Sequence, residues 1–233
     1  MLFSILAWTG GVVNTIFWGT LSLIFSLFDS SGKLQHLCSR WWSRINLKIS
    51  GTRVEVSGQE NAIKDGPQIF ASNHQSIYDI LMLAGYLPIQ FRWLAKKELF
   101  NIPFMGWHMS RMGYIKIDRS NMRQAALSFR KAAEKIKSGV SVVIFPEGTR
   151  SSDGKLQPFK PGLFSLALHS GVPIIPVSIN GSKDIVKKGS LRVNIGKISM
   201  ILGKPIDVSK YQKGDKTKLM KEVRKAISLN LKT

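Results

Sequence analysis

Two long apolar patterns open the chain. Residues 1–28 are apolar or small and carry no charged side chain, and about 20 such residues suffice to cross the hydrocarbon core of a bilayer. After a turn at 29–32, residues 33–49 place apolar side chains at helical spacing with cations around them. Trp41 and Trp42 suit the headgroup level of a membrane. These patterns predict a membrane-associated segment of two helices over residues 1–49.

The first apolar pattern leaves two membrane geometries open. It could be one true span followed by a surface helix, or the first half of a helical hairpin dipped into one leaflet. The residues that weaken a continuous span are Gly10, Gly11, Asn14 and Gly19. The segment lacks the basic start and the small-residue cleavage site of a secretory signal, so we expect it to stay attached. Two core helices packed on a soluble domain are the remaining alternative.

From residue 50 onward, short β-rich runs alternate with helical patterns. We expect strands at 53–58, 68–72, 90–95, 114–118, 141–145 and 173–179, and further strands within 190–203. We expect helices at 77–87, 103–112, 121–139 and 217–231. This alternation predicts an α/β domain over residues 50–233, with a mixed, largely parallel sheet that helices cover on both faces.

The charge balance narrows the partners. A formal net charge of +20 favours a partner that carries phosphates or an anionic surface. We expect an anionic membrane surface and no nucleic acid, because the start is uncharged and no helix-turn-helix or RNP pattern is found. Cys38 is the single cysteine, which excludes an internal disulfide and a cysteine metal site and favours a reducing compartment. We therefore expect a location at the cytoplasmic face of the cell membrane.

The stretch SNHQSIYDI holds the first candidate chemistry. The strand at 68–72 ends at Ser72, so His74 falls in a loop at the carboxyl end of a strand, where open α/β sheets place their sites. On one straight helix His74 and Asp79 would lie about 140° apart, so they meet only if the chain bends between them. Asp79 could then accept a hydrogen bond from one ring nitrogen and raise the basicity of the other. A loop histidine without chemistry is the alternative.

A second loop follows the strand at 141–145. It contains Gly148, which permits close backbone approach, Thr149 with its hydroxyl, and Arg150, which can bind a phosphate bidentately. Arg119 and Lys96 each lie at the end of another expected strand and could reach an anionic head group. The loop is therefore a candidate phosphate site, and a solvated turn is the alternative.

Four blocks in this order, NHQSIYD, GYIKIDR, FPEGTRS and VPIIPVSI, closely resemble the glycerolipid acyltransferase family, specifically its 1-acylglycerol-3-phosphate acyltransferases. The resemblance covers about residues 69–179. It implies transfer of a fatty acyl group from a thioester of acyl carrier protein or coenzyme A to the sn-2 hydroxyl of 1-acylglycerol 3-phosphate (lysophosphatidic acid), which gives phosphatidic acid. It implies no bound cofactor and no metal.

The same resemblance assigns roles to individual residues. It implies that His74 is the general base and Asp79 its orienting partner. The residues that it assigns to the glycerol phosphate are Arg119, Glu147, Gly148, Thr149 and Arg150, to which Lys96 is added from its place after a strand. We expect no acyl-enzyme, because no G-x-S-x-G nucleophile elbow occurs and Cys38 is expected in the membrane segment, away from the motifs.

Two alternatives to this function stay open. The first is a related acyltransferase that uses glycerol 3-phosphate or another lysophospholipid as acceptor. The second is a membrane lipid-binding protein of the same fold without activity, against which the intact His74 and Asp79 speak. A P-loop nucleotide enzyme is excluded, because G-x-x-x-x-G-K-[ST] is absent.

Overall fold

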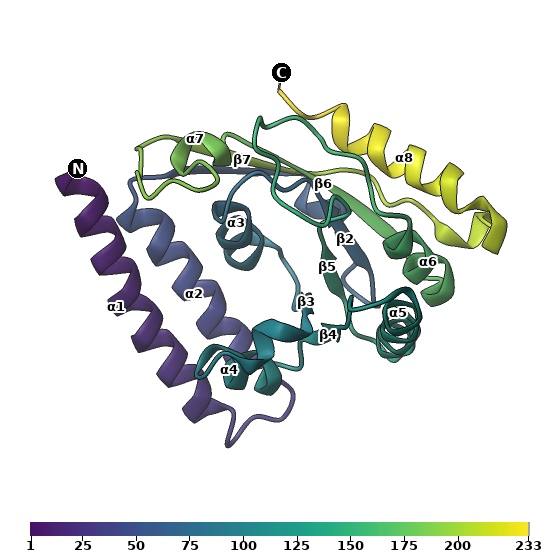
Figure 1. Cartoon of the computed structure of the whole chain (residues 1–233), viewed down its shortest axis with the longest axis horizontal. Helices are drawn as coiled ribbons and strands as arrows, with labels where there is room; N and C mark the ends of the chain where they lie inside the picture. Colours follow the sequence, from purple (N-terminus) through teal and green to yellow (C-terminus); the bar gives the residue numbers. More distant parts are fainter. Residues whose placement is uncertain (233) are drawn as a thin grey trace.

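The N-terminal segment forms a hairpin of two helices. The computed structural model describes residues 1–232, the side chain of Lys213 apart, so Thr233 of the predicted domain lies outside the described residues. Helices α1 (Leu2–Phe25) and α2 (Lys33–Ile49) run along one side of the molecule (Figure 1). Asp29 holds the turn between them, because its carboxylate accepts the backbone N–H groups of Ser31 and Leu34, each at 2.8 Å. The two predicted helices and their turn are confirmed.

Seven strands form one sheet in the order β1-β7-β6-β2-β5-β3-β4. Their bounds are β1 Arg53–Ser57, β2 Ile69–Ser72, β3 Arg92–Lys96, β4 Ile115–Ile117, β5 Val142–Ile144, β6 Ile174–Asn180 and β7 Lys197–Leu202. Neighbouring strands are parallel except β6 and β7, which are antiparallel. The predicted mixed, largely parallel sheet is confirmed.

Helices cover both faces of the sheet (Figure 1). The remaining α-helices are α3 Tyr78–Tyr86, α4 Met105–Arg111, α5 Met122–Lys137, α6 Pro161–Ser170, α7 Ser182–Ile185 and α8 Lys216–Ser228. Short 3₁₀ helices lie at Gln59–Asn61, Lys97–Asn101, Val208–Lys210 and Lys213–Asp215. Strand β2 shows how the two cores arise: Phe70 packs with α3, whereas Ile69 and Ala71 pack with α5, α6 and α8. This is the two-residue alternation of a strand buried on both faces.

Helices α6 and α7 and one expected strand differ from the sequence expectation. The sequence pattern does not predict helix α6, because the Pro-Gly pair at its start is typical of a helix break. Pro161 nevertheless takes the first helical turn, where its missing N–H costs nothing, and Gly171 ends the helix with a φ of 67°. Residues 190–196, expected as strand, form a loop that leads into β7.

Candidate active site

His74 lies in the loop between β2 and α3, and a neighbouring strand holds this loop in place. The Asn73 side chain donates to the carbonyl of Ile179 at 2.9 Å and accepts its N–H at 2.7 Å. Asn73 thereby pairs with strand β6 as a backbone amide would. The loop is thus fixed at the carboxyl end of β2, in the position expected for a site in an α/β sheet.

The chain bends after His74 and helix α3 begins at Tyr78, so Asp79 lies in the first helical turn. One carboxylate oxygen of Asp79, Oδ2, accepts the backbone N–H groups of Gln75 at 2.6 Å and Ser76 at 2.8 Å. The same oxygen lies 2.9 Å from Nδ1 of His74, and Asp79 is fully buried. The predicted bend and the predicted contact between the two side chains are confirmed.

The imidazole of His74 is fixed on its ring face as well. Phe145, the last residue before the second loop, stacks on it with ring centroids 3.8 Å apart and an interplanar angle of 12°. With Nδ1 engaged by Asp79, Nε2 is the ring nitrogen available to a substrate. The side chain is 13% exposed and lines the large cavity described below. The arrangement can remove a proton from a hydroxyl group in that cavity.

Glu147 has a different environment from the one expected. It is 2% exposed, and its two carboxylate oxygens accept the backbone N–H groups of His74 at 2.6 Å and Gln157 at 2.7 Å. Burial raises the pKa of this carboxyl, and the two backbone hydrogen bonds oppose the shift. Each oxygen of this carboxylate thus already accepts a backbone N–H group. These contacts are those of a residue that positions the backbone of His74, and the expected assignment of Glu147 to the glycerol phosphate stays a prediction.

The backbone of His74 is held on both sides by the loop that follows β5. Its N–H donates to Glu147, and its carbonyl accepts the N–H of Ser151 at 2.8 Å. Arg224 of helix α8 supports this loop from behind, donating to the carbonyls of Leu156 at 2.7 Å and Gln157 at 2.5 Å. Sequence reasoning missed Arg224, because its position on an amphipathic helix resembles that of any surface arginine.

The cationic side of the site gathers the other predicted residues. Those that line the cavity together with His74 are Lys96, Arg119, Gly148, Thr149 and Arg150. Gly148 has a φ of 74°, and a Cβ at this position would lie 3.9 Å from Nη1 of Arg119. The left-handed backbone explains a glycine at this turn, whereas the guanidinium lies at an ordinary van der Waals distance.

Lys96 and Lys97 differ in their partners. Nζ of Lys97 lies 2.7 Å from the Asp118 carboxylate, which raises the pKa of the lysine and lowers that of Asp118 to about 2. Lys96 is exposed and lines the cavity. Of the two lysines, Lys96 is therefore the one placed to meet an anionic ligand.

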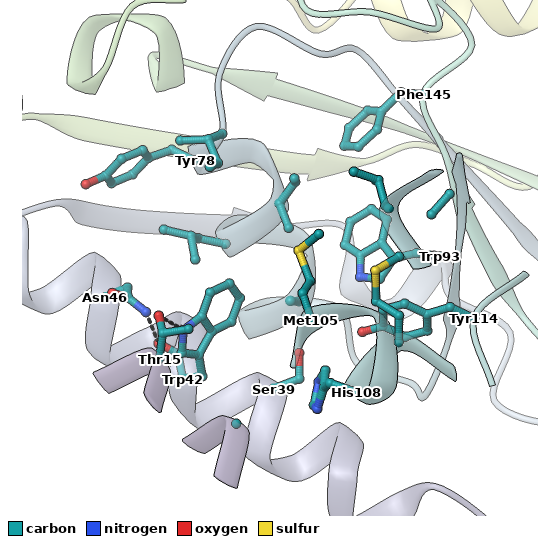
Figure 2. A pocket seen from close by; sticks show the side chains of 18 of the residues that line it. Thr15, Ser39, Trp42, Asn46, Tyr78, Trp93, Met105, His108, Tyr114 and Phe145 are labelled. Atoms are coloured by element: carbon teal, nitrogen blue, oxygen red, sulfur yellow. Dashed lines mark hydrogen bonds between the residues drawn. The ribbon is translucent and has the colours of Figure 1, made fainter. Parts of the chain in front are cut away.

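The cavity has a volume of about 1090 Å³, at the upper end of the usual range for ligand pockets. It extends from His74 between the helical hairpin, α3, α4 and the sheet (Figure 2). Its walls are largely apolar and aromatic; the labelled examples are Trp42, Tyr78, Trp93, Met105, Tyr114 and Phe145. A long apolar chain fits such walls, with its reactive end beside His74.

Cys38 lines this cavity too. It lies on α2, within the segment where it was expected, and α2 turns it toward the same large cavity that His74 lines. Burial raises the pKa of its thiol, which disfavours the reactive thiolate. Among residues 1–232, no group of three His, Cys, Asp or Glu side chains is arranged to hold a metal ion.

Comparison with known proteins agrees with this geometry. Residues 53–180 match the acyltransferase family model. A mixed α/β sheet with a paired histidine and aspartate at a strand end, and this match, place the chain in the acyltransferase family.

Individual acyltransferases are similar to this chain in sequence. The chain is 37% identical over 187 residues to a chloroplastic 1-acyl-sn-glycerol-3-phosphate acyltransferase of Brassica napus, covering 79% of this chain and 54% of the relative. It is 32% identical over 212 residues to the Saccharomyces cerevisiae 1-acyl-sn-glycerol-3-phosphate acyltransferase, covering 89% and 70%. The chain thus spans about half the length of the chloroplastic relative and more of the yeast one.

A solved structure is similar over nearly the whole chain. The crystal structure of the 1-acyl-sn-glycerophosphate (LPA) acyltransferase PlsC from Thermotoga maritima superposes with a TM-score of 0.85 at 29% identity. The match covers 98% of this chain and 92% of that one. The likeness therefore includes the N-terminal hairpin as well as the α/β domain.

We predict that Glu147→Gln lowers turnover. The amide nitrogen cannot accept a hydrogen bond, so one buried backbone N–H loses its partner at a cost of about 1–3 kcal/mol. If that cost appears as misplacement of His74, kcat for acyl transfer falls about 10- to 100-fold while KM for the acceptor stays within about threefold. Steady-state kinetics of this variant are compared with those of Glu134→Gln. Glu134 is an exposed glutamate on α5 and serves as the control. A raised KM with unchanged kcat would return Glu147 to substrate binding.

Proposed function

We propose that this chain transfers a fatty acyl group from an acyl thioester to the sn-2 hydroxyl of 1-acylglycerol 3-phosphate, giving phosphatidic acid. One observation carries the proposal: the His74–Asp79 pair lies in a single cavity with a cationic side and a long apolar side. These three parts match the reacting hydroxyl, the phosphate and the acyl chains of such a substrate. The names of the relatives support the choice of acceptor.

The mechanism follows from the fixed imidazole. Nε2 of His74 takes the proton of the acceptor hydroxyl as its oxygen attacks the thioester carbonyl. The tetrahedral intermediate then collapses, the C–S bond breaks, and the imidazolium returns the proton to the departing thiolate. Asp79 holds the proton on Nδ1 throughout and stabilises the imidazolium. The acceptor supplies its own nucleophile, so no acyl-enzyme forms and Cys38 has no part in the transfer.

The phosphate of the acceptor is bound on the cationic side. Arg119 and Arg150 present guanidinium groups that can bind phosphate bidentately, and Lys96 adds a third positive charge. Thr149 contributes a hydroxyl. These groups line the cavity. The Glu147 carboxylate is not among the lining groups, and it accepts the backbone N–H of His74 instead.

The hairpin attaches the protein to the membrane in this proposal, with residues 1–49 as the anchor and 50–233 as the catalytic domain. Of the helices in residues 1–232, α1 alone is long and apolar enough to cross a bilayer. It is tied to α2, since Asn14 donates to the Trp42 carbonyl at 3.0 Å and the Trp42 indole donates to Thr15 at 2.9 Å. Helix α2 in turn donates from Arg40 and Arg44 to the carbonyls of Leu87 and Gly85.

These ties favour one of the two membrane geometries. A spanning α1 would draw the cationic helix α2 into the hydrocarbon or break both contacts. We therefore favour a hairpin that dips into one leaflet at the cytoplasmic face. From there a lipid product can leave the cavity into the bilayer, while acyl carrier protein or coenzyme A delivers the acyl group from the water.

An acceptor panel tests the proposed reaction. Purified protein is given an acyl-coenzyme A or an acyl-carrier-protein thioester with 1-acylglycerol 3-phosphate, glycerol 3-phosphate or a lysophosphatidylcholine, and the lipid products are analysed by mass spectrometry. We expect phosphatidic acid from the first acceptor at a rate at least about tenfold above the others. A preference for glycerol 3-phosphate or the choline lipid would establish the related acyltransferase instead, and no transfer at all would favour a lipid-binding protein.

We predict that Arg150→Ala weakens acceptor binding. Loss of charge-assisted hydrogen bonds of about 1.5–3 kcal/mol raises KM for the phosphate-bearing acceptor about 10- to 100-fold, with little change in kcat. Arg53→Ala, which removes an exposed arginine from the far edge strand β1, is the control and leaves KM unchanged. If the Arg150→Ala enzyme has the same KM as the control, Arg150 does not bind the phosphate of the acceptor.

A further inference from the structure

The loop between α7 and β7, residues 186–196, lies beside the start of the helical hairpin. Figure 1 shows it next to the N-terminal end of α1. The Trp8 indole donates to the Leu191 carbonyl at 2.7 Å, and the N–H of Val193 donates to the Ser4 hydroxyl at 3.0 Å. The loop is thus fixed to α1 through its backbone, which leaves its side chains to point elsewhere.

Two large apolar side chains of this loop have no place in the core. Leu191 is 77% exposed and Ile195 is 69% exposed, whereas Val193 between them is buried. Scattered apolar residues on a surface need no explanation, but Leu191 lies where the loop is bonded to the start of α1 and Ile195 lies beside Gly51, just after α2. The loop therefore borders both ends of the hairpin that meet there, and another exposed apolar surface begins on α1. On the neighbouring start of α1, Leu2, Ile5 and Leu6 are exposed as well.

The charges of the loop are of one sign. Lys187, Lys188 and Arg192 are exposed, and no acidic residue occurs between Val186 and Ile206. Apolar side chains bracketed by cations are typical of segments that enter the boundary between headgroups and acyl chains of an anionic bilayer. A partner protein would have to cover the loop and the apolar α1 together, whereas a bilayer meets both at once.

We propose that the α7–β7 loop is a second membrane contact, at which Leu191 and Ile195 insert beside α1 and Lys187 and Arg192 bind lipid phosphates. This inference rests on the membrane attachment proposed above. A rod-like hairpin alone leaves the domain free to rotate about the axis of α1, and a second contact removes that freedom. Nζ of Lys188 donates to the Arg150 carbonyl at 2.9 Å, so the loop also joins the membrane contact to the phosphate side of the cavity.

Vesicle binding by the full chain tests this contact. Wild type, Leu191→Asp and the double variant with Ile195→Asp are sedimented with vesicles of phosphatidylglycerol and phosphatidylcholine, and with pure phosphatidylcholine. We expect Leu191→Asp to weaken partitioning onto the anionic vesicles about tenfold, and the double variant to weaken it further. Arg192→Gln should weaken anionic binding and leave binding to pure phosphatidylcholine unchanged.

The matched control is Leu229→Asp, since Leu229 is 73% exposed but lies at the end of α8, a helix that packs on α6 and β6. Acyl transfer in detergent micelles should be equal in all variants, which verifies an intact fold. If Leu191→Asp binds vesicles as well as Leu229→Asp does, the loop contact is overturned and the hairpin anchor stands. If the wild-type protein does not bind vesicles, both the hairpin anchor and the loop contact are contradicted, whatever the activity in detergent micelles. If the double variant binds vesicles as the wild type does and differs only in being a monomer where the wild type is a dimer, a second copy of the chain covers the loop. That result would overturn the proposal.

Discussion

The site depends on one carboxylate oxygen that accepts three hydrogen-bond donors. Oδ2 of Asp79 binds the N–H groups of Gln75 and Ser76 and lies within hydrogen-bond distance of the His74 ring. The two backbone bonds stabilise the bend before α3, at a helix start where a negative charge is favourable. The same charge then orients the imidazole. The local fold and the chemistry therefore share one interaction, because without the bend a five-residue spacing would point the two side chains apart.

A second buried carboxylate fixes the other side of the histidine. A buried charge is costly unless it is well hydrogen-bonded, and Glu147 meets this condition by accepting from two loops that are distant in sequence. Phe145 covers the ring and Arg224 supports the far loop from α8. Residues from the loops after β2 and β5, from α3 and from the C-terminal helix thus position one imidazole, as catalytic geometry requires. The hairpin and α4 complete the site by enclosing its apolar side (Figure 2).

Much of this could be predicted from the sequence, for physical reasons that differ from residue to residue. The sheet was predictable because buried strands show as short apolar runs, and the bend at His74 because helical geometry forbids the alternative. The contacts of Glu147 were not predictable, because its neighbours in sequence suggest a phosphate loop and its hydrogen-bond partners lie 73 and 10 residues away. That Cys38 lines the cavity was not predictable, because the face that α2 turns to the cavity depends on its packing against α3. The alternation in residues 190–196 predicted a strand, yet the segment bonds to α1 through the backbone of Leu191 and Val193, and the side chains of Leu191 and Ile195 are exposed.

In the proposed mechanism, Nε2 of His74 carries the proton in a direct transfer between thioester and acceptor. The most direct test is kcat for phosphatidic acid formation by His74→Ala, at saturating acceptor and thioester, with folding and vesicle binding verified. Removal of a general base lowers turnover by about 10²- to 10⁴-fold, so we expect a loss in this range without a change in vesicle binding. A His74→Ala protein that is folded, bound to vesicles and within a few-fold of wild-type turnover would contradict it.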